Sequence, residues 1–411
     1  MLYTCVYGFR KTFAVATFDG IEYYGISYKV WLVVFQVIGY AMSKFIGIKV
    51  VSELKSSSRA KGILLFSMIA AFSWLLFGLV PAPYNIIFLL TNGLPLGMIW
   101  GLIFSYLEGR QTTEALGAGL SVSFIFSAGF SKTVGAWVLM WGVSETWMPF
   151  VASLIFIPPL LFFLWLLNKT PPPTDMDEAL RTKRKPMNAD ERREFVRMFA
   201  PVLFVLILAY MMLTAMRDFR DNFSKEIWTA LGYTASPEIF TLTEIPIAIF
   251  VLIAIGSMIF INNNKKALFV NLYMILAGFA FVAIGTLMFK NHLIAPPVWI
   301  VITGLGLYLG YVPFNCVLFE RLIAAFRIPG TVGFVMYLAD SFGYLGSVGV
   351  LLYKEFAQPN VSWVDFFVTS GVITGLLGIA LLTISIFLIF GYNENSITSG
   401  RRSIRPVHKI R

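Results

Sequence analysis

The stretch Tyr7-Gly8-Phe9-Arg10-Lys11-Thr12-Phe13-Ala14-Val15-Ala16 places two adjacent cations inside the first apolar segment, which runs from Met1 to Phe18. A helix of that length just spans a bilayer core of roughly 30 Å, so Arg10 is expected near the midplane. A guanidinium at that depth costs on the order of 3 kcal/mol on insertion scales. Such a residue normally faces a wet cavity or a partner. A cation that lines the interior of a membrane protein makes the protein a candidate anion handler.

The composition indicates a membrane protein throughout. Of the 411 residues, 58% are hydrophobic and 13% are charged, whereas soluble domains carry about 25% charged residues. The mean hydropathy is +0.77. We therefore expect an all-α membrane protein with twelve transmembrane helices, at 1–20, 29–51, 62–80, 86–108, 116–141, 148–168, 198–223, 238–262, 267–289, 298–320, 331–353 and 366–392.

A long polar loop divides these spans six and six. We expect four parts: an N-terminal six-helix bundle at 1–168, a cytoplasmic linker at 169–197, a C-terminal six-helix bundle at 198–392, and a basic cytoplasmic tail at 393–411. Residues 191–197 are expected to form a short amphipathic helix at the membrane surface.

The two halves resemble each other in sequence. The stretch Phe9–Ala14 is similar to Phe219–Ser224, and Gly117–Gly135 is similar to Gly330–Gly349, at nearly constant offsets. This similarity predicts two pseudo-symmetric bundles with a cavity between them, an arrangement in which substrates bind near the midplane.

The net charge of +10 has a topological explanation. Lysines and arginines concentrate in one alternating set of connections, above all in 169–197 and in the tail, whereas the opposite set contains Lys29, Lys225, Lys290 and Lys354. This bias places both termini and the long loop in the cytoplasm of a multi-pass inner-membrane protein. The charge therefore does not indicate a nucleic-acid partner.

Other classes of site find no support in the sequence. The two cysteines lie in apolar segments and the two histidines lie in a loop and in the tail, so we expect no metal site. No phosphate-binding loop, zinc motif or serine-hydrolase elbow is present, so we expect no enzyme activity and no cofactor.

Two sets of motifs carry a resemblance to a known family. Tyr7-x-x-Arg10-Lys11-x-Phe13-Ala14-x-Ala16 and Ile38-Gly39-Tyr40-x-x-Ser43-Lys44-Phe45 resemble spans 1 and 2 of the organophosphate:phosphate antiporter family of the major facilitator superfamily. Phe342-Gly343-Tyr344-Leu345-Gly346 resembles span 11 of that family. The glycerol-3-phosphate and hexose-phosphate transporters belong to it, so the resemblance implies the major facilitator fold and a phosphate-ester substrate.

The resemblance also implies roles for individual residues. In that family an arginine of span 1 and an arginine of span 7 bind the phosphate group, and a lysine of span 2 lies beside the substrate. Arg10 and Lys44 match the first and third of these positions. Either Arg217, by the family motif, or Arg220, by the internal repeat, matches the second.

Alternatives to these roles are structural. Arg10 could pair permanently with a buried acid, Lys44 could form a helix-packing ion pair, and Arg217 and Arg220 could belong to a local charge cluster with Asp218 and Asp221. Tyr40 and Tyr344 could hydrogen-bond a substrate or bridge helices. The buried acids Asp340 and Glu244 are candidates for ion pairing or for carrying a coupling proton.

The sequence also departs from the family. The family carries a histidine in the binding region of span 5, and this sequence has none there, although Lys132 follows one turn later. In the loop after span 2, Glu53 stands in place of the family's usual acid. Taken together, the motifs and the resemblance lead us to expect a monomeric secondary transporter of a small organic anion. We expect the anion to be a phosphate ester and the coupling ion to be phosphate or a proton. The alternatives are a transporter-like sensor of a phosphorylated metabolite and a lysophospholipid translocator.

Overall fold

The computed structural model describes residues 1–53, 58–107, 113–171, 189–233, 236–326, 332–358 and 360–391. Most of the expected linker and the whole of the expected tail at 393–411 lie outside these ranges. Nearly all the described residues are helical. The helices of the first half are α1 (Leu2–Lys11), α2 (Tyr28–Glu53), α3 (Arg59–Leu79), α4 (Ile87–Leu107), α5 (Thr113–Met140) and α6 (Met148–Asn168), with short 3-10 turns η1 (Thr12–Val15) and η3 (Tyr84–Ile86).

The second half is equally helical. It contains α8 (Ala189–Asn222), α9 (Ser224–Ala230), α10 (Ile239–Gly256), η4 (Ser257–Phe260), α11 (Asn264–Lys290), α12 (Pro296–Cys316), α13 (Leu318–Ala325), α14 (Val332–Ala357) and α15 (Trp363–Gly391). Among the described residues, nine helices are long and apolar enough to cross a membrane. Of the remaining three expected spans, 29–51 and 331–353 coincide with α2 and α14, whereas 1–20 contains the shorter helix α1 followed by η1. The predicted all-α membrane fold is confirmed.

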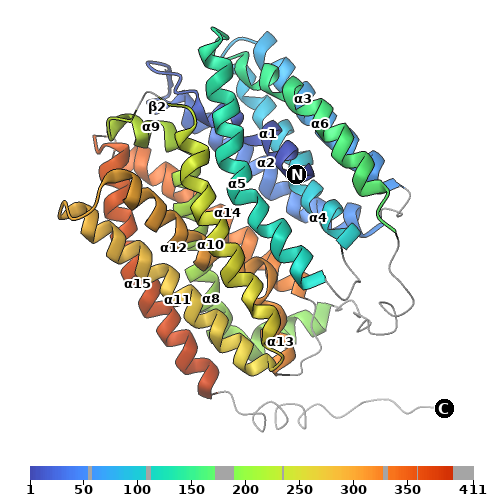
Figure 1. The fold of residues 1–411 in the computed structure, drawn as a ribbon, viewed down its shortest axis with the longest axis vertical. Helices are drawn as coiled ribbons and strands as arrows, with labels where there is room; N and C mark the ends of the chain where they lie inside the picture. Colours follow the sequence, from blue (N-terminus) through green and yellow to red (C-terminus); the bar gives the residue numbers. More distant parts are fainter. Residues whose placement is uncertain are drawn as a thin grey trace.

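The helices pack mainly within their own half of the chain. In the first half, α2 and α3 pack on α4, and α1 packs on α5 and α6; in the second, α11 packs on α12 and α15, and α8 packs on α14 and α15. Figure 1 shows the blue-to-green helices of the first half beside the light-green-to-red helices of the second. The halves meet where α5 lies along α10 and where α2 lies along α14.

Three boundaries differ from the sequence prediction. The expected surface helix at 191–197 is not a separate element, because α8 begins at Ala189 and runs unbroken to Asn222. The expected span 298–320 is two helices, since α12 ends at Cys316 and α13 begins at Leu318.

The third difference concerns the first span, in which the helix ends at Lys11 and a 3-10 turn continues only to Val15. Beyond it the backbone N–H groups of Thr17 and Phe18 donate to the Glu145 carboxylate at 2.7 and 2.8 Å. Because a distant side chain satisfies these donors, the chain can leave the helix early. It then forms a hairpin of β1 (Glu22–Tyr23) and β2 (Ile26–Ser27).

Glycines allow α11 and α12 to approach closely. A Cβ added to Gly278 would lie 2.6 Å from the carbonyl oxygen of Gly306, which is closer than any real contact. We expect Gly278→Val to force the two helices apart and to cost about 1–3 kcal/mol of stability. Gly349→Val is the matched control, because a Cβ at this helical glycine meets nothing within 4 Å. Thermal unfolding in detergent tests the contrast, and equal melting temperatures for the two variants would contradict it.

Candidate functional site

Arg10 lies in the last turn of α1 and is almost fully buried, at 7% exposure. Its guanidinium lies over the Tyr40 ring at 3.9 Å and near the Tyr7 ring at 6.0 Å. Within the described parts of the chain it forms no ion pair, and its Nε is buried without a hydrogen-bond partner. A buried guanidinium needs acceptors to offset its desolvation, so this one is available to an anion. The expected alternative, a permanent pairing of Arg10 with an acid, is not what the described residues show.

Side chains of three other helices hold the backbone around Arg10. Because α1 ends at Lys11, the carbonyl groups of its last turn have no partners within the helix. Trp74 and Asn92 donate to the carbonyl of Phe9 at 2.6 and 3.1 Å, and Gln36 donates to the carbonyl of Arg10 at 3.1 Å. These bonds replace the missing helical ones and fix the position from which the Arg10 side chain projects.

Arg217 presents a second guanidinium in a similar setting. It lies over the Tyr311 ring at 3.8 Å and donates to the Asp218 carboxylate at 2.7 Å. Asp218 in turn accepts a hydrogen bond from Ser347 at 3.1 Å. Each arginine is therefore held on a tyrosine face, a geometry that orients a guanidinium by cation–π attraction.

The structure brings Arg10 and Arg217 into one neighbourhood. Tyr7 and Tyr344 both lie within electrostatic reach of the two guanidinium groups. Tyr344 of the second half also packs edge-on against Tyr40 of the first half, with ring centroids 5.3 Å apart. The predicted residues Arg10, Tyr40, Arg217 and Tyr344 thus line the contact between the two halves.

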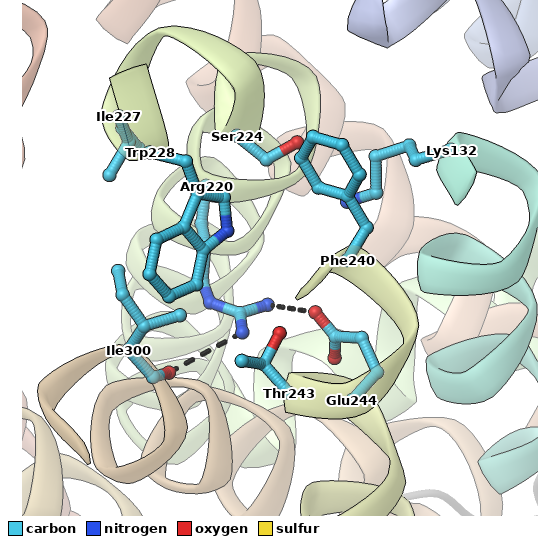
Figure 2. A pocket seen from close by; sticks show the side chains of 9 residues that line it. All are labelled: Lys132, Arg220, Ser224, Ile227, Trp228, Phe240, Thr243, Glu244 and Ile300. Atoms are coloured by element: carbon cyan, nitrogen blue, oxygen red, sulfur yellow. Dashed lines mark hydrogen bonds and ion pairs between the residues drawn. The ribbon is translucent and has the colours of Figure 1, made fainter. Parts of the chain in front are cut away.

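Arg220 has different partners from Arg217. Its Nη1 donates to Glu244 of α10 at 2.7 Å, and its Nη2 donates to the carbonyl of Ile300 at 3.4 Å, as Figure 2 shows. Lys132 and Trp228 contribute to the walls of the small cavity beside this pair. Its volume of about 10 Å³ has room for one water at most. The Arg220–Glu244 pair lies wholly within the second half and links α8 to α10.

Asp221 connects the two halves through two lysines. Its carboxylate lies 2.6 Å from the Lys11 ammonium and 2.8 Å from the Lys132 ammonium, and all three side chains are buried. Lys11 also donates to Asn222 at 2.7 Å. Both lysines belong to the first half and Asp221 to the second, so these ion pairs hold the halves together at this level. The Lys29–Glu226 ion pair also joins the halves.

Lys44 and Asp340 form a further ion pair between the halves. The Lys44 ammonium of α2 lies 3.2 Å from Asp340 of α14 and 5.2 Å from the centre of the Tyr40 ring. The other oxygen of Asp340 accepts a hydrogen bond from the Tyr210 hydroxyl at 2.5 Å. Lys44 was expected either beside the substrate or in a helix-packing ion pair. The structure shows the ion pair, and this pair lies beside the Arg10 site.

The interior carries more positive than negative charge. The central charged cluster consists of six cations (Arg10, Lys11, Lys44, Lys132, Arg217 and Arg220) and four carboxylates (Asp218, Asp221, Glu244 and Asp340). Among these described residues the excess is therefore two positive charges. It arises because Arg10 has no carboxylate partner in the described parts of the chain and because Lys11 and Lys132 share one. An anion with two negative charges would balance the cluster as long as all four carboxylates stay charged.

Three residues in or beside this cluster were not singled out as site residues from the sequence. A sequence pattern could have indicated Tyr311, since Tyr308 and Tyr311 are three residues apart and so share one face of a helix. Lys11 also had a signal, because it follows Arg10 inside an apolar segment. The role of Asp221 had none, since its two lysine partners lie far away in the sequence.

Comparisons with known proteins assign the sequence to a family without assigning it a function. The sequence matches the model of a family of unknown function, DUF5690, over residues 12–391. No curated protein matches the sequence.

Solved transporter structures are similar in fold. A D-xylose–proton symporter superposes with a TM-score of 0.62 at 14% identity, covering 93% of this chain and 96% of that chain. A bacterial homologue of the human drug peptide transporters PepT1 and PepT2 gives 0.61 at 13% identity, covering 94% and 96%. A bacterial homologue of the human lysosomal transporter Spinster, inward-facing and unoccupied, gives 0.58 at 14%, covering 94% of each chain.

At such identities the likeness shows the fold alone, and it fits the major facilitator fold that was expected from the sequence. The family assignment rests on the sequence match, which spans nearly the whole chain. By that match, the chain belongs to the family of unknown function DUF5690.

Proposed function

We propose that this protein is a secondary transporter that carries a small organic anion by alternating access, and that this anion is a phosphate ester. The observation that carries the proposal is the buried Arg10 guanidinium, which lies in one neighbourhood with Arg217 of the other half and has no acceptor among the described residues. Arginine presents a planar fork that matches phosphate or carboxylate with two hydrogen bonds.

The charge of the central cluster favours a doubly charged substrate. A phosphate ester carries about −1.5 to −2 charges at neutral pH, close to the excess of two cations in the cluster. A simple carboxylate would neutralise only half of this excess. Because one arginine comes from each half, binding would draw the halves together and lower the barrier to rocking between the two open states. Arg217 is the second binding arginine in this proposal, and Arg220 supports the fold.

We infer the membrane and the orientation of the protein from the distribution of lysines and arginines in its loops. In this proposal it is a monomer in the cell inner membrane, with its termini, the linker and the tail in the cytoplasm. Phosphate or a proton is the coupling ion, and the protein catalyses no covalent reaction. The resemblance of spans 1, 2 and 11 to the organophosphate:phosphate antiporters supports the phosphate-ester substrate.

Binding to the purified protein tests the proposal. We expect sn-glycerol 3-phosphate or glucose 6-phosphate to raise the melting temperature in detergent, and glucose and glycerol to leave it unchanged. Uptake of the stabilising ester into vesicles then distinguishes a transporter from a sensor, which would bind without flux. Stabilisation by the neutral sugars with no response to any phosphate ester would contradict the proposed substrate class.

A further inference from the structure

Asp340 differs from the other acids of the central charged cluster in how it is paired across the two halves. It belongs to α14 of the second half, and its ion-pair partner Lys44 belongs to α2 of the first. Asp218 and Glu244 instead pair with Arg217 and Arg220 of their own half. Asp221 does join the halves, but two lysines share it, so the loss of one would leave the other. Among these four described acids, only Asp340 depends on a single cation from the opposite half.

Tyr40 links this ion pair to the anion site. Its ring lies under the Arg10 guanidinium at 3.9 Å and beside the Lys44 ammonium at 5.2 Å. An anion bound to Arg10 therefore lies at the ring that Lys44 also flanks. A lysine ammonium is a point charge on a flexible stem, so Lys44 can turn from Asp340 toward a bound dianion. The bound anion and Asp340 thus compete for one cation.

The surroundings of Asp340 determine whether its carboxylate can stay charged once Lys44 turns away. Asp340 is only 7% exposed. The titratable groups that face it are Lys44 and Tyr40 of α2, Tyr210 of α8, Tyr311 of α12 and Tyr344 of α14. Of these described groups, Lys44 alone is charged at neutral pH. Removing one partner of a buried ion pair leaves an uncompensated buried charge, which is costly.

We propose that Asp340 takes up one proton each time an anion binds at Arg10 and Arg217, and that the protein is therefore an anion–proton symporter. The proton from the medium adds to the oxygen of Asp340 that Lys44 vacates, while Tyr210 continues to donate to the other oxygen. When the anion leaves, Lys44 returns and the proton is released to the same side of the membrane as the anion. No covalent bond of the substrate changes. This inference rests on the proposed function, since it needs an anion at Arg10.

Proton uptake on binding is the direct test. Titration calorimetry of the purified protein with sn-glycerol 3-phosphate at pH 8, in two buffers of different ionisation enthalpy, counts the protons taken up per anion. We expect about one more proton for the wild type than for Asp340→Asn. Lys44→Gln should also lose this uptake, because its Asp340 carries the proton before the anion arrives. Glu244→Gln is the matched control, a buried acid whose ion pair stays within one half, and it should match the wild type.

Vesicle assays separate this inference from the proposed function. In wild-type vesicles, labelled sn-glycerol 3-phosphate should exchange at equal pH on both sides and should accumulate when the outside is more acidic. We expect Asp340→Asn to keep exchange and to lose accumulation. Exchange with no response to the pH gradient, or binding with the same proton uptake in Asp340→Asn as in the wild type, would overturn the inference and leave the proposed function standing. Absence of both binding and exchange for every phosphate ester would overturn both.

Discussion

Arg10→Ala is expected to lower the affinity for a stabilising phosphate ester by about 100-fold while the protein remains folded. Hydrogen bonds to charged groups are worth about 1.5–3 kcal/mol each, and the variant loses the whole guanidinium fork. The fold should survive because Arg10 has no carboxylate partner among the described residues, so its removal leaves no acid unpaired. Titration calorimetry measures the affinity, and thermal unfolding measures the stability.

Two further variants define what Arg10 contributes. Arg10→Lys keeps the charge and loses the planar fork, so we expect a loss of affinity between those of the wild type and Arg10→Ala. Arg220→Ala is the matched control for the loss of a buried arginine. We expect this variant to lose stability and to keep its affinity for the ester. It leaves Glu244 buried without its cation, so stability should fall. Unchanged affinity in Arg10→Ala would contradict the role of Arg10.

Asp221→Ala is expected to destabilise the protein by about 3–5 kcal/mol, the usual cost of breaking a buried ion pair from one side. The variant leaves the Lys11 and Lys132 ammonium groups buried together without the carboxylate that lies 2.6 and 2.8 Å from them. Two like charges left on either side of the missing carboxylate repel, and water must enter to solvate them. The melting temperature in detergent should fall accordingly.

A second substitution tests whether charge is the cause. Adding Lys132→Met to Asp221→Ala removes one of the two stranded cations, so we expect the double variant to be more stable than Asp221→Ala alone. Asp19→Asn, which changes an exposed acid of the same half as the lysines, should leave the melting temperature unchanged. A double variant less stable than Asp221→Ala would show that the lysine does not act through its charge.

Much of the fold could be predicted from the sequence because lipid imposes a simple pattern. Apolar stretches of about 20 residues form helices in a bilayer, since a helix satisfies the backbone hydrogen bonds within the stretch itself. The helix boundaries were less predictable where a distant side chain decides them. Glu145 ends the first span early by accepting from Thr17 and Phe18, and nothing near these two residues in the sequence announces that contact.

The site was predictable only in part for a similar reason. The burial of Arg10 agrees with its place inside an apolar segment, and its depth in the membrane stays a prediction. The choice between Arg217 and Arg220 could not be predicted, because they lie three residues apart on one helix face. Their different partners decide it: Tyr311 of α12 orients Arg217, and Glu244 of α10 holds Arg220. Pairings between helices far apart in the chain carry no local signal, and this applies equally to Lys44 with Asp340.

A structure determined with a phosphate ester bound tests the central claim most directly. We expect the phosphate group between the two halves, with its oxygens within about 3 Å of the guanidinium groups of both Arg10 and Arg217. A phosphate bound elsewhere, with Arg10 still lying on Tyr40 and no anion near it, would contradict the account.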